Sequence, residues 1–127
     1  MGLLDRLFGG GGKKVLPDRV RDLETFRKLV LKSDVPVIVD VWSASCGPCK
    51  KLEPVLIEVA TRHAGRVRLV EIGTGDADPK LLARLDVRST PTLIVFDRGE
   101  ELGRSSGYRP ASWFDHMIET EFPARSE

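Results

Sequence analysis

Cys46 and Cys49 are the only two cysteines of this 127-residue chain, and Gly47 and Pro48 separate them. Two thiols at this spacing can close a disulfide. The pair follows an apolar run and precedes residues with helical spacing, so we expect both thiols near the start of a helix. The first question is whether this position makes them reactive or leaves them structural.

A helix start favours reactivity. Its unpaired backbone N–H groups and the positive end of its dipole stabilise a thiolate on Cys46. Cys-x-x-Cys thiols in such a position have pKa values lowered from about 8.5 to about 3.5–7.5. Pro48 suits a first turn, where its missing N–H is not needed, and Gly47 leaves the approach to the sulfur open. We therefore predict thiol–disulfide exchange, in which Cys46 attacks a substrate disulfide and Cys49 resolves the mixed disulfide.

Asp40 is the one charged residue in the apolar, β-branched run from Pro36 to Trp42. Such a run is typical of a central strand buried on both faces, where an unpaired carboxylate is expensive. Burial raises the pKa of a carboxyl group toward neutral pH, which would suit Asp40 to deprotonate Cys49. The alternative is a structural aspartate bonded to backbone or water, and its proximity to the cysteines favours the functional interpretation.

The elements around this site alternate between strands and helices. Apolar spacing, Gly65 as a helix stop, Asp78-Pro79 as a helix start and a turn at Asp97–Glu100 divide the chain. Expected strands lie before Asp22, at 36–42, 67–72 and 92–96, and near Leu102; expected helices cover 23–33, 49–65 and 78–85 and start again at Pro110, with Trp113, Phe114, Met117 and Ile118 facing the core. This order predicts an α/β fold, with one mixed sheet and helices on both faces.

Composition limits the possible partners. Hydrophobic residues make up 41% of the chain and charged residues 31%, which is typical of one soluble globular domain. A formal charge of +1 gives no bulk attraction to nucleic acid. No stretch approaches the roughly 18 apolar residues of a membrane span, and no secretory signal is recognisable, so we expect no stable membrane insertion and a cytoplasmic location. In that compartment a cysteine pair is more often catalytic or metal-binding than structural.

A zinc site is the first competing interpretation. Zinc normally takes four ligands, and His63 and His116 are the only histidines that could complete the set. Neither has ligand-like spacing to the cysteines, and we expect both on the surface. The sequence therefore predicts no metal and no cofactor.

Several separated motifs together resemble the thioredoxin family. They are Asp40-Val41-Trp42, Cys46-Gly47-Pro48-Cys49-Lys50, Pro54, Thr90-Pro91-Thr92, Gly99 and Gly107, and they span roughly residues 18–122. The resemblance implies a thioredoxin fold, an α/β structure with a central mixed sheet of four to five strands flanked by helices on both faces. It also implies that Pro91 is cis and faces the cysteine pair.

The resemblance also implies roles for individual residues. Cys46 would be the attacking thiol, Cys49 the resolving thiol and Asp40 the buried acid–base group, while the backbone of Thr90 would pair with an extended substrate. The substrate-binding positions it implies are Trp42, Ser45, Gly47, Pro48, Thr90, Pro91 and Gly107. The expected partners are protein disulfides and a thioredoxin reductase or another dithiol donor, and we expect a monomer.

The chain departs from the family pattern at two places. Ser45 stands where the family usually has tryptophan, which affects the choice of partner more than the chemistry. The segment from Glu71 to Asp76 is glycine-rich and one residue longer than the family pattern, and Glu71 stands about where the family has lysine. A like charge there would raise the pKa of Asp40 further if the side chain points inward.

Residues 1–16 are expected to form a flexible extension, and residues 17–127 the thioredoxin-like domain. The extension holds a short amphipathic segment and a glycine linker, with apolar residues at Leu3, Leu4, Leu7 and Phe8. Alternatively, it docks on a partner or a membrane surface. Together with Ser45 it motivates a second hypothesis for the whole chain, a holdase-like binding or assembly module with little or no redox turnover.

Overall fold

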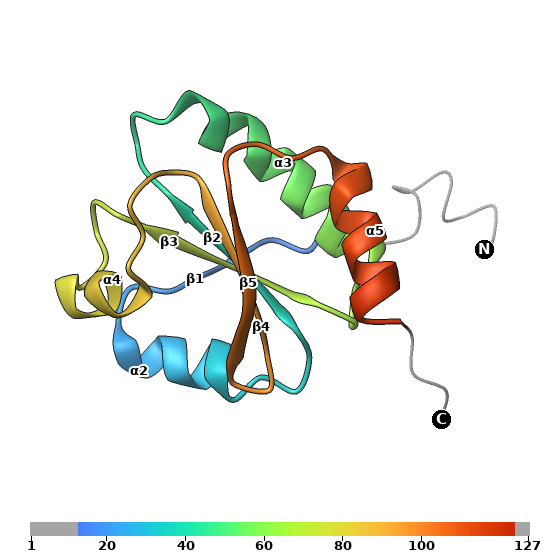
Figure 1. Ribbon diagram of the computed structural model, residues 1–127, viewed down its shortest axis with the longest axis horizontal. Helices are drawn as coiled ribbons and strands as arrows, with labels where there is room; N and C mark the ends of the chain where they lie inside the picture. The colour runs from blue at the N-terminus through green and yellow to red at the C-terminus, as the bar shows by residue number, and fades with distance from the viewer. Residues whose placement is uncertain (1–12, 124–127) are drawn as a thin grey trace.

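The computed structural model describes residues 13–123, which form a five-stranded sheet with helices on both faces (Figure 1). The strands are β1 (Asp18–Arg19), β2 (Val37–Trp42), β3 (Arg68–Gly73), β4 (Thr92–Asp97) and β5 (Glu100–Ser106). Their order across the sheet is β1-β3-β2-β4-β5. β1, β3 and β2 run parallel, whereas β4 and β5 are antiparallel to their neighbours. The predicted α/β fold with a mixed sheet is confirmed.

The two faces of the sheet carry separate apolar clusters. Phe26 and Val30 lie with Leu81 and Leu85 against one face. These residues come from α2 (Leu23–Phe26), from its π-helical continuation η1 (Arg27–Leu31) and from α4 (Pro79–Leu85). The other face is covered by α3 (Gly47–Arg62) and α5 (Ala111–Glu121), which lie together on the opposite side in Figure 1. Each helix therefore buries its apolar stripe against the sheet.

β2 is the central strand, and its alternation sorts side chains between the two clusters. Val37, Val39 and Val41 belong to the cluster under α2 and α4, while Ile38 belongs to the cluster under α3 and α5. Successive residues of a strand point to opposite faces. Asp40 therefore points to the same face as Ile38, the face that α3 covers.

Local sequence signals produce two helix starts and the hairpin turn. The Asp22 and Asp78 side chains cap α2 and α4 by accepting hydrogen bonds from the backbone N–H groups of Thr25 and Lys80. The hairpin between β4 and β5 has positive φ at Arg98 and at Gly99 (φ 82°), as a tight two-residue turn requires. The predicted helix start at Asp78 and the predicted turn at Asp97–Glu100 are confirmed, whereas the cap at Asp22 was not predicted.

Two predictions about side-chain exposure are wrong. Trp113 was expected to face the core with Phe114 and Ile118, but it is 36% exposed, and the Arg109 guanidinium lies 5.2 Å from the centre of its ring. One residue on a helix turns by about 100°, so Trp113 falls outside the stripe of its neighbour. His63 was expected on the surface, but it is buried, and its Nε2 lies 2.8 Å from a carboxylate oxygen of Asp115. This contact joins the end of α3 to α5.

The expected N-terminal extension lies mostly outside the described residues, because residues 1–12 are not among them. In the described part, the Val15 N–H donates to the Thr61 hydroxyl on α3 at 2.8 Å, and Val15 packs against the cluster under α3 and α5. The division into 1–16 and 17–127 stays a prediction. Within residues 13–123, no helix is long and apolar enough to cross a membrane.

Candidate functional site

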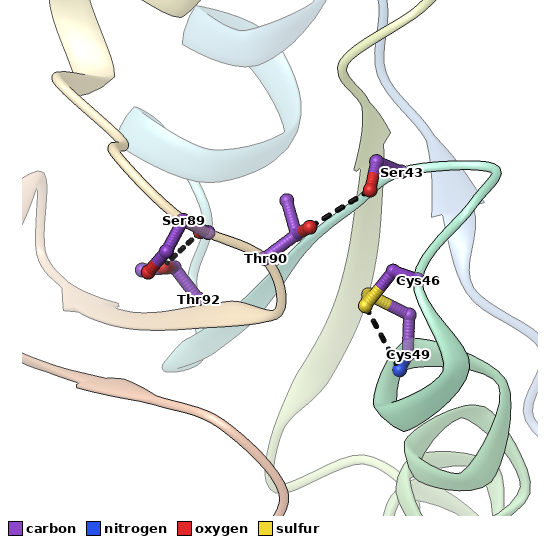
Figure 2. The surroundings of a disulfide bond; sticks show 6 residues. All are labelled: Ser43, Cys46, Cys49, Ser89, Thr90 and Thr92. Atoms are coloured by element: carbon purple, nitrogen blue, oxygen red, sulfur yellow. Dashed lines mark hydrogen bonds between the residues drawn. A yellow bond between two sulfur atoms is a disulfide. The ribbon is translucent and has the colours of Figure 1, made fainter.

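Cys46 and Cys49 lie at the start of α3 and form a disulfide, with 5.3 Å between their Cα atoms (Figure 2). Cys46 is the N-cap residue, and its Sγ accepts a hydrogen bond from the Cys49 N–H at 3.2 Å. A backbone N–H at a helix start is thus already directed at the sulfur of Cys46. The predicted position of the pair at a helix start is confirmed.

The disulfide is mostly buried, but the residues around it are exposed. Cys46 is 8% exposed and Cys49 5%, whereas Ser45, Gly47 and Pro48 are exposed. A Cβ atom added at Gly47 would meet no other atom within 4 Å. The packing of the protein itself therefore does not require glycine at this exposed position.

The loop before β4 lies beside the disulfide. Its Thr90–Pro91 peptide bond is cis, as the family resemblance implied. The Thr90 hydroxyl points toward the Ser43 hydroxyl, and 2.8 Å separates the two oxygens (Figure 2). The Pro91 carbonyl accepts a hydrogen bond from the Gly107 N–H at 2.9 Å. Segments that follow β2, precede β4 and follow β5 therefore meet at this site.

The loop is also held from within. The Thr92 hydroxyl donates to the Ser89 carbonyl at 2.7 Å, and this hydrogen bond spans Thr90 and Pro91 in the sequence. In contrast, the backbone N–H and carbonyl of Thr90 have no backbone partner in the described part of the chain. Thr90 thus presents free backbone groups from a loop that its neighbours fix.

Asp40 lies beneath the disulfide and shares a cavity with Cys49. Asp40 is 5% exposed, and among the described residues its Oδ1 has no hydrogen-bond partner. The cavity has a volume of about 210 Å³ and is lined by Arg19, Asp40, Trp42, Ser43, Ala44, Cys49, Lys50, Glu53 and Glu71. The pKa of Asp40 is raised to about 7, mainly by burial and additionally by the negative charges of Glu71 and Glu53.

Glu71 is the closest counterpart of Asp40 on the neighbouring strand. The two residues are register partners on β2 and β3, so their side chains point to the same face. Glu71 is 7% exposed, and its carboxylate lies 3.0 Å from Nε of Arg19 on β1. The inward orientation that the sequence left open is therefore present, and the paired Arg19 was not foreseen.

Gly73, the last residue of β3, accommodates the Trp42 side chain. A Cβ atom added at Gly73 would lie 2.8 Å from Cζ2 of the Trp42 indole, closer than such atoms approach. The Trp42 carbonyl also accepts a hydrogen bond from the Thr74 N–H at 2.9 Å. The sequence showed the glycine-rich segment around Gly73 only as a departure from the family. The Trp42 indole gives the physical reason for the glycine at position 73.

Replacing Gly73 by alanine is expected to displace the Trp42 indole and to lower the free energy of unfolding by about 1–3 kcal/mol, because overpacking forces neighbours to shift. Urea denaturation followed by tryptophan fluorescence measures the change. Gly75→Ala is the matched control, since a Cβ atom there meets nothing within 4 Å. Equal losses in the two variants would contradict this account of Gly73.

The raised pKa of Asp40 predicts a pH-dependent stability. The folded state keeps the proton up to about pH 7, whereas the unfolded chain releases it near the ordinary aspartate pKa of 3.8. The folded state therefore binds more protons between these pH values, so this group lowers the free energy of unfolding as pH rises from about 4 to 7. Asp40→Asn is expected to stabilise the oxidised protein by about 2–4 kcal/mol at pH 8 and by little at pH 4.

Urea denaturation at a series of pH values tests this expectation. Asp34→Asn is the control, because Asp34 is exposed and lies outside the cavity. A gain from Asp40→Asn that is the same at pH 4 and pH 8 would show that the carboxylate charge is not its source.

The side chains of the described residues provide no alternative metal centre. Across residues 13–123, no group of three or more His, Cys, Asp or Glu side chains is arranged to hold a metal ion. His63 contacts Asp115 at the far end of α3, and His116 is exposed on α5.

Comparison with known proteins adds independent evidence. The family model "Thioredoxin" matches residues 19–120. Thioredoxin 1 of Nostoc sp. (strain PCC 7120) is 37% identical over 95 residues, which cover 75% of this chain and 88% of the relative. Thioredoxin of Porphyra purpurea is 36% identical over 94 residues, covering 74% and 87%. Thioredoxin M-type, chloroplastic, of Brassica napus is 40% identical over 77 residues, covering 61% and 43%.

The matched region contains the disulfide at the start of α3, the buried Asp40 and the cis Pro91. The chain belongs to the thioredoxin family of thiol–disulfide oxidoreductases.

Proposed function

We propose that this protein reduces disulfides of protein substrates, with Cys46 as the attacking thiol, Cys49 as the resolving thiol and Asp40 as the proton acceptor. The observation that carries the proposal is the cavity beneath the disulfide. Its lining joins Cys49 to a buried carboxyl group whose pKa is raised to about 7. A group with that pKa can take up and release a proton at neutral pH.

The reaction starts from the dithiol form. The Cys46 thiolate, stabilised by the helix start and the Cys49 N–H, attacks one sulfur of the substrate disulfide. The substrate S–S bond breaks, a Cys46–substrate disulfide forms, and the first substrate thiolate leaves and takes a proton from solvent.

The second step closes the enzyme disulfide. Asp40 accepts the Cys49 thiol proton, and the Cys49 thiolate attacks the Cys46 sulfur. The Cys46–Cys49 bond forms, the bond from Cys46 to the substrate breaks, and the second substrate thiolate departs. Two electrons have then passed from the enzyme dithiol to the substrate, and the enzyme is left in the disulfide form.

A substrate segment would bind in extended form along the loop before β4. The proposal is supported by the free backbone groups of Thr90 and by the fixed cis bond to Pro91, because an extended peptide can add to unpaired backbone groups. Gly107 holds the Pro91 carbonyl, and Trp42 supports the site from inside the cavity. The exposed residues Ser45, Gly47 and Pro48 would contact the partner on the other side of the sulfur.

Turnover requires a donor that returns the disulfide to the dithiol. We propose a thioredoxin reductase or another dithiol donor, acting on a monomer in the cytoplasm, where thiols are kept reduced. The printed name of the Brassica napus relative places that protein in the chloroplast.

Single cysteine variants are expected to separate the two thiol roles. Cys46→Ser abolishes reduction of a protein disulfide with dithiothreitol as donor, because no attacking sulfur remains. Cys49→Ser stops after one attack and accumulates a mixed disulfide, which mass spectrometry of the non-reduced protein detects. Native turnover no faster than that of Cys46→Ser would favour the holdase-like binding module instead.

Ser45→Trp is expected to raise kcat/KM with thioredoxin reductase by about tenfold. The reason is that an aromatic side chain buried against the reductase contributes about 1.5–3 kcal/mol of contact energy. A steady-state NADPH oxidation assay measures the rate, with Ser112→Trp on the exposed side of α5 as the control. Equal rates for the native protein and Ser45→Trp would refute a role of Ser45 in partner choice.

A further inference from the structure

The cavity beneath the disulfide contains more charge than the proposed reaction uses. Asp40 is its buried proton acceptor, but the lining also includes Arg19, Lys50, Glu53 and Glu71. Lys50 and Glu53 are exposed on α3, whereas Glu71 is nearly as buried as Asp40. A second buried carboxylate beside the first is costly unless a cation is close to it.

Arg19 is the cation that compensates Glu71. Its Nε lies 3.0 Å from the Glu71 carboxylate, and the Arg19 side chain is 49% exposed while that of Glu71 is 9% exposed. The ion pair therefore extends from the solvent to the carboxylate next to Asp40. β1 is a two-residue strand at the edge of the sheet. Arg19 can therefore be partly exposed to solvent and still contact the buried Glu71 carboxylate.

We propose that the Arg19–Glu71 ion pair is a positioning pair that controls when Asp40 can accept the proton of Cys49. The inference rests on the proposed function, because it assigns the pair to the same proton transfer. Glu71 disfavours a second negative charge on its register partner Asp40, and Arg19 limits this repulsion by pairing with Glu71. Neither residue contacts the substrate or exchanges electrons.

The groups that face Asp40 can be stated element by element. β1 contributes Arg19, β3 contributes Glu71, and α3 contributes Cys49, Lys50 and Glu53. The register partner of Asp40 on β4 is Leu93, which is uncharged. Among these charged groups, Arg19 and Glu71 are the two in direct contact with each other, and each can be substituted separately.

The two members of the pair should act in opposite directions. Without Glu71, the remaining Arg19 stabilises the Asp40 carboxylate, so Asp40 holds a proton less readily. Without Arg19, Glu71 repels the Asp40 carboxylate without compensation, so Asp40 holds its proton more readily. A purely structural ion pair that fastens β1 to β3 would instead give the same loss for either substitution.

The test uses Glu71→Gln, Arg19→Gln and the double variant in the full chain. The carboxyl carbon of Asp40 is titrated by NMR in the oxidised protein, and the pH profile of protein-disulfide reduction is measured in single turnover. We expect the Asp40 midpoint to fall by about one pH unit in Glu71→Gln and to rise by about one in Arg19→Gln, with the double variant between them. The pH profile of the reduction should follow these shifts.

Arg21→Gln is the matched control. Arg21 follows β1 and pairs with Asp76 through an Nε–carboxylate contact of the same 3.0 Å, but neither residue lines the cavity. Arg21→Gln should leave the Asp40 midpoint unchanged. Arg19→Lys should keep the Asp40 midpoint at its native value, in contrast to Arg19→Gln, because lysine keeps the positive charge.

Shifts of the same sign in Glu71→Gln and Arg19→Gln, or no shift in either, would overturn the inference. Absence of disulfide reduction by the native protein would instead overturn the proposed function. The NMR titration of the oxidised protein would still test the ion pair in that case, so the two failures are distinguishable. If Glu71→Gln does not fold, Arg19→Gln at the half-exposed position still shows in which direction the Asp40 midpoint moves.

Discussion

The burial of the Asp40 carboxyl group is the constraint on which the site depends. A carboxyl group in the middle of a five-stranded sheet loses most of its hydration, and its raised pKa near 7 reflects that cost. Burial of the apolar side chains of β2 offsets this unfavourable free energy, and Val37, Val39 and Val41 are fully buried. The same packing that stabilises the strand therefore places, beneath Cys49, a carboxyl group that titrates near neutral pH.

The position of β2 explains how the other parts reach this carboxyl group. α3 follows β2 directly, so the disulfide stands at the end of the strand that carries Asp40. β4 pairs antiparallel with β2, so the loop before β4 lies next to the carboxyl end of β2. The hydroxyls of Ser43 and Thr90 join these two segments at 2.8 Å. The site is thus assembled by strand direction and needs only short connections.

The sequence predicted the features that depend on local chemistry. The helix start at Asp78 and the hairpin glycine at Gly99 follow from the preferences of single residues, and the sheet follows from apolar patterning. It did not predict the pairs that join distant segments. Arg19 and Glu71 are separated by 52 positions, and His63 and Asp115 by the same number, so neither contact leaves a periodic signal. Gly73 likewise has no readable role until Trp42 is placed against it.

The contact between Arg19 and Glu71 also gives a reason for the departure from the family pattern. A lysine at the position of Glu71 would place a cation directly beside Asp40, whereas here the cation comes from β1 and a carboxylate lies between it and Asp40. Both arrangements combine Asp40 with a positive charge, but the intervening carboxylate reverses the sign of the nearest neighbour. A like charge makes Asp40 hold its proton more strongly, while the Arg19 guanidinium pairs with the buried Glu71 carboxylate. Reversing the charge at one position on β3 therefore requires a partner on an adjacent strand, and the edge strand β1 supplies it.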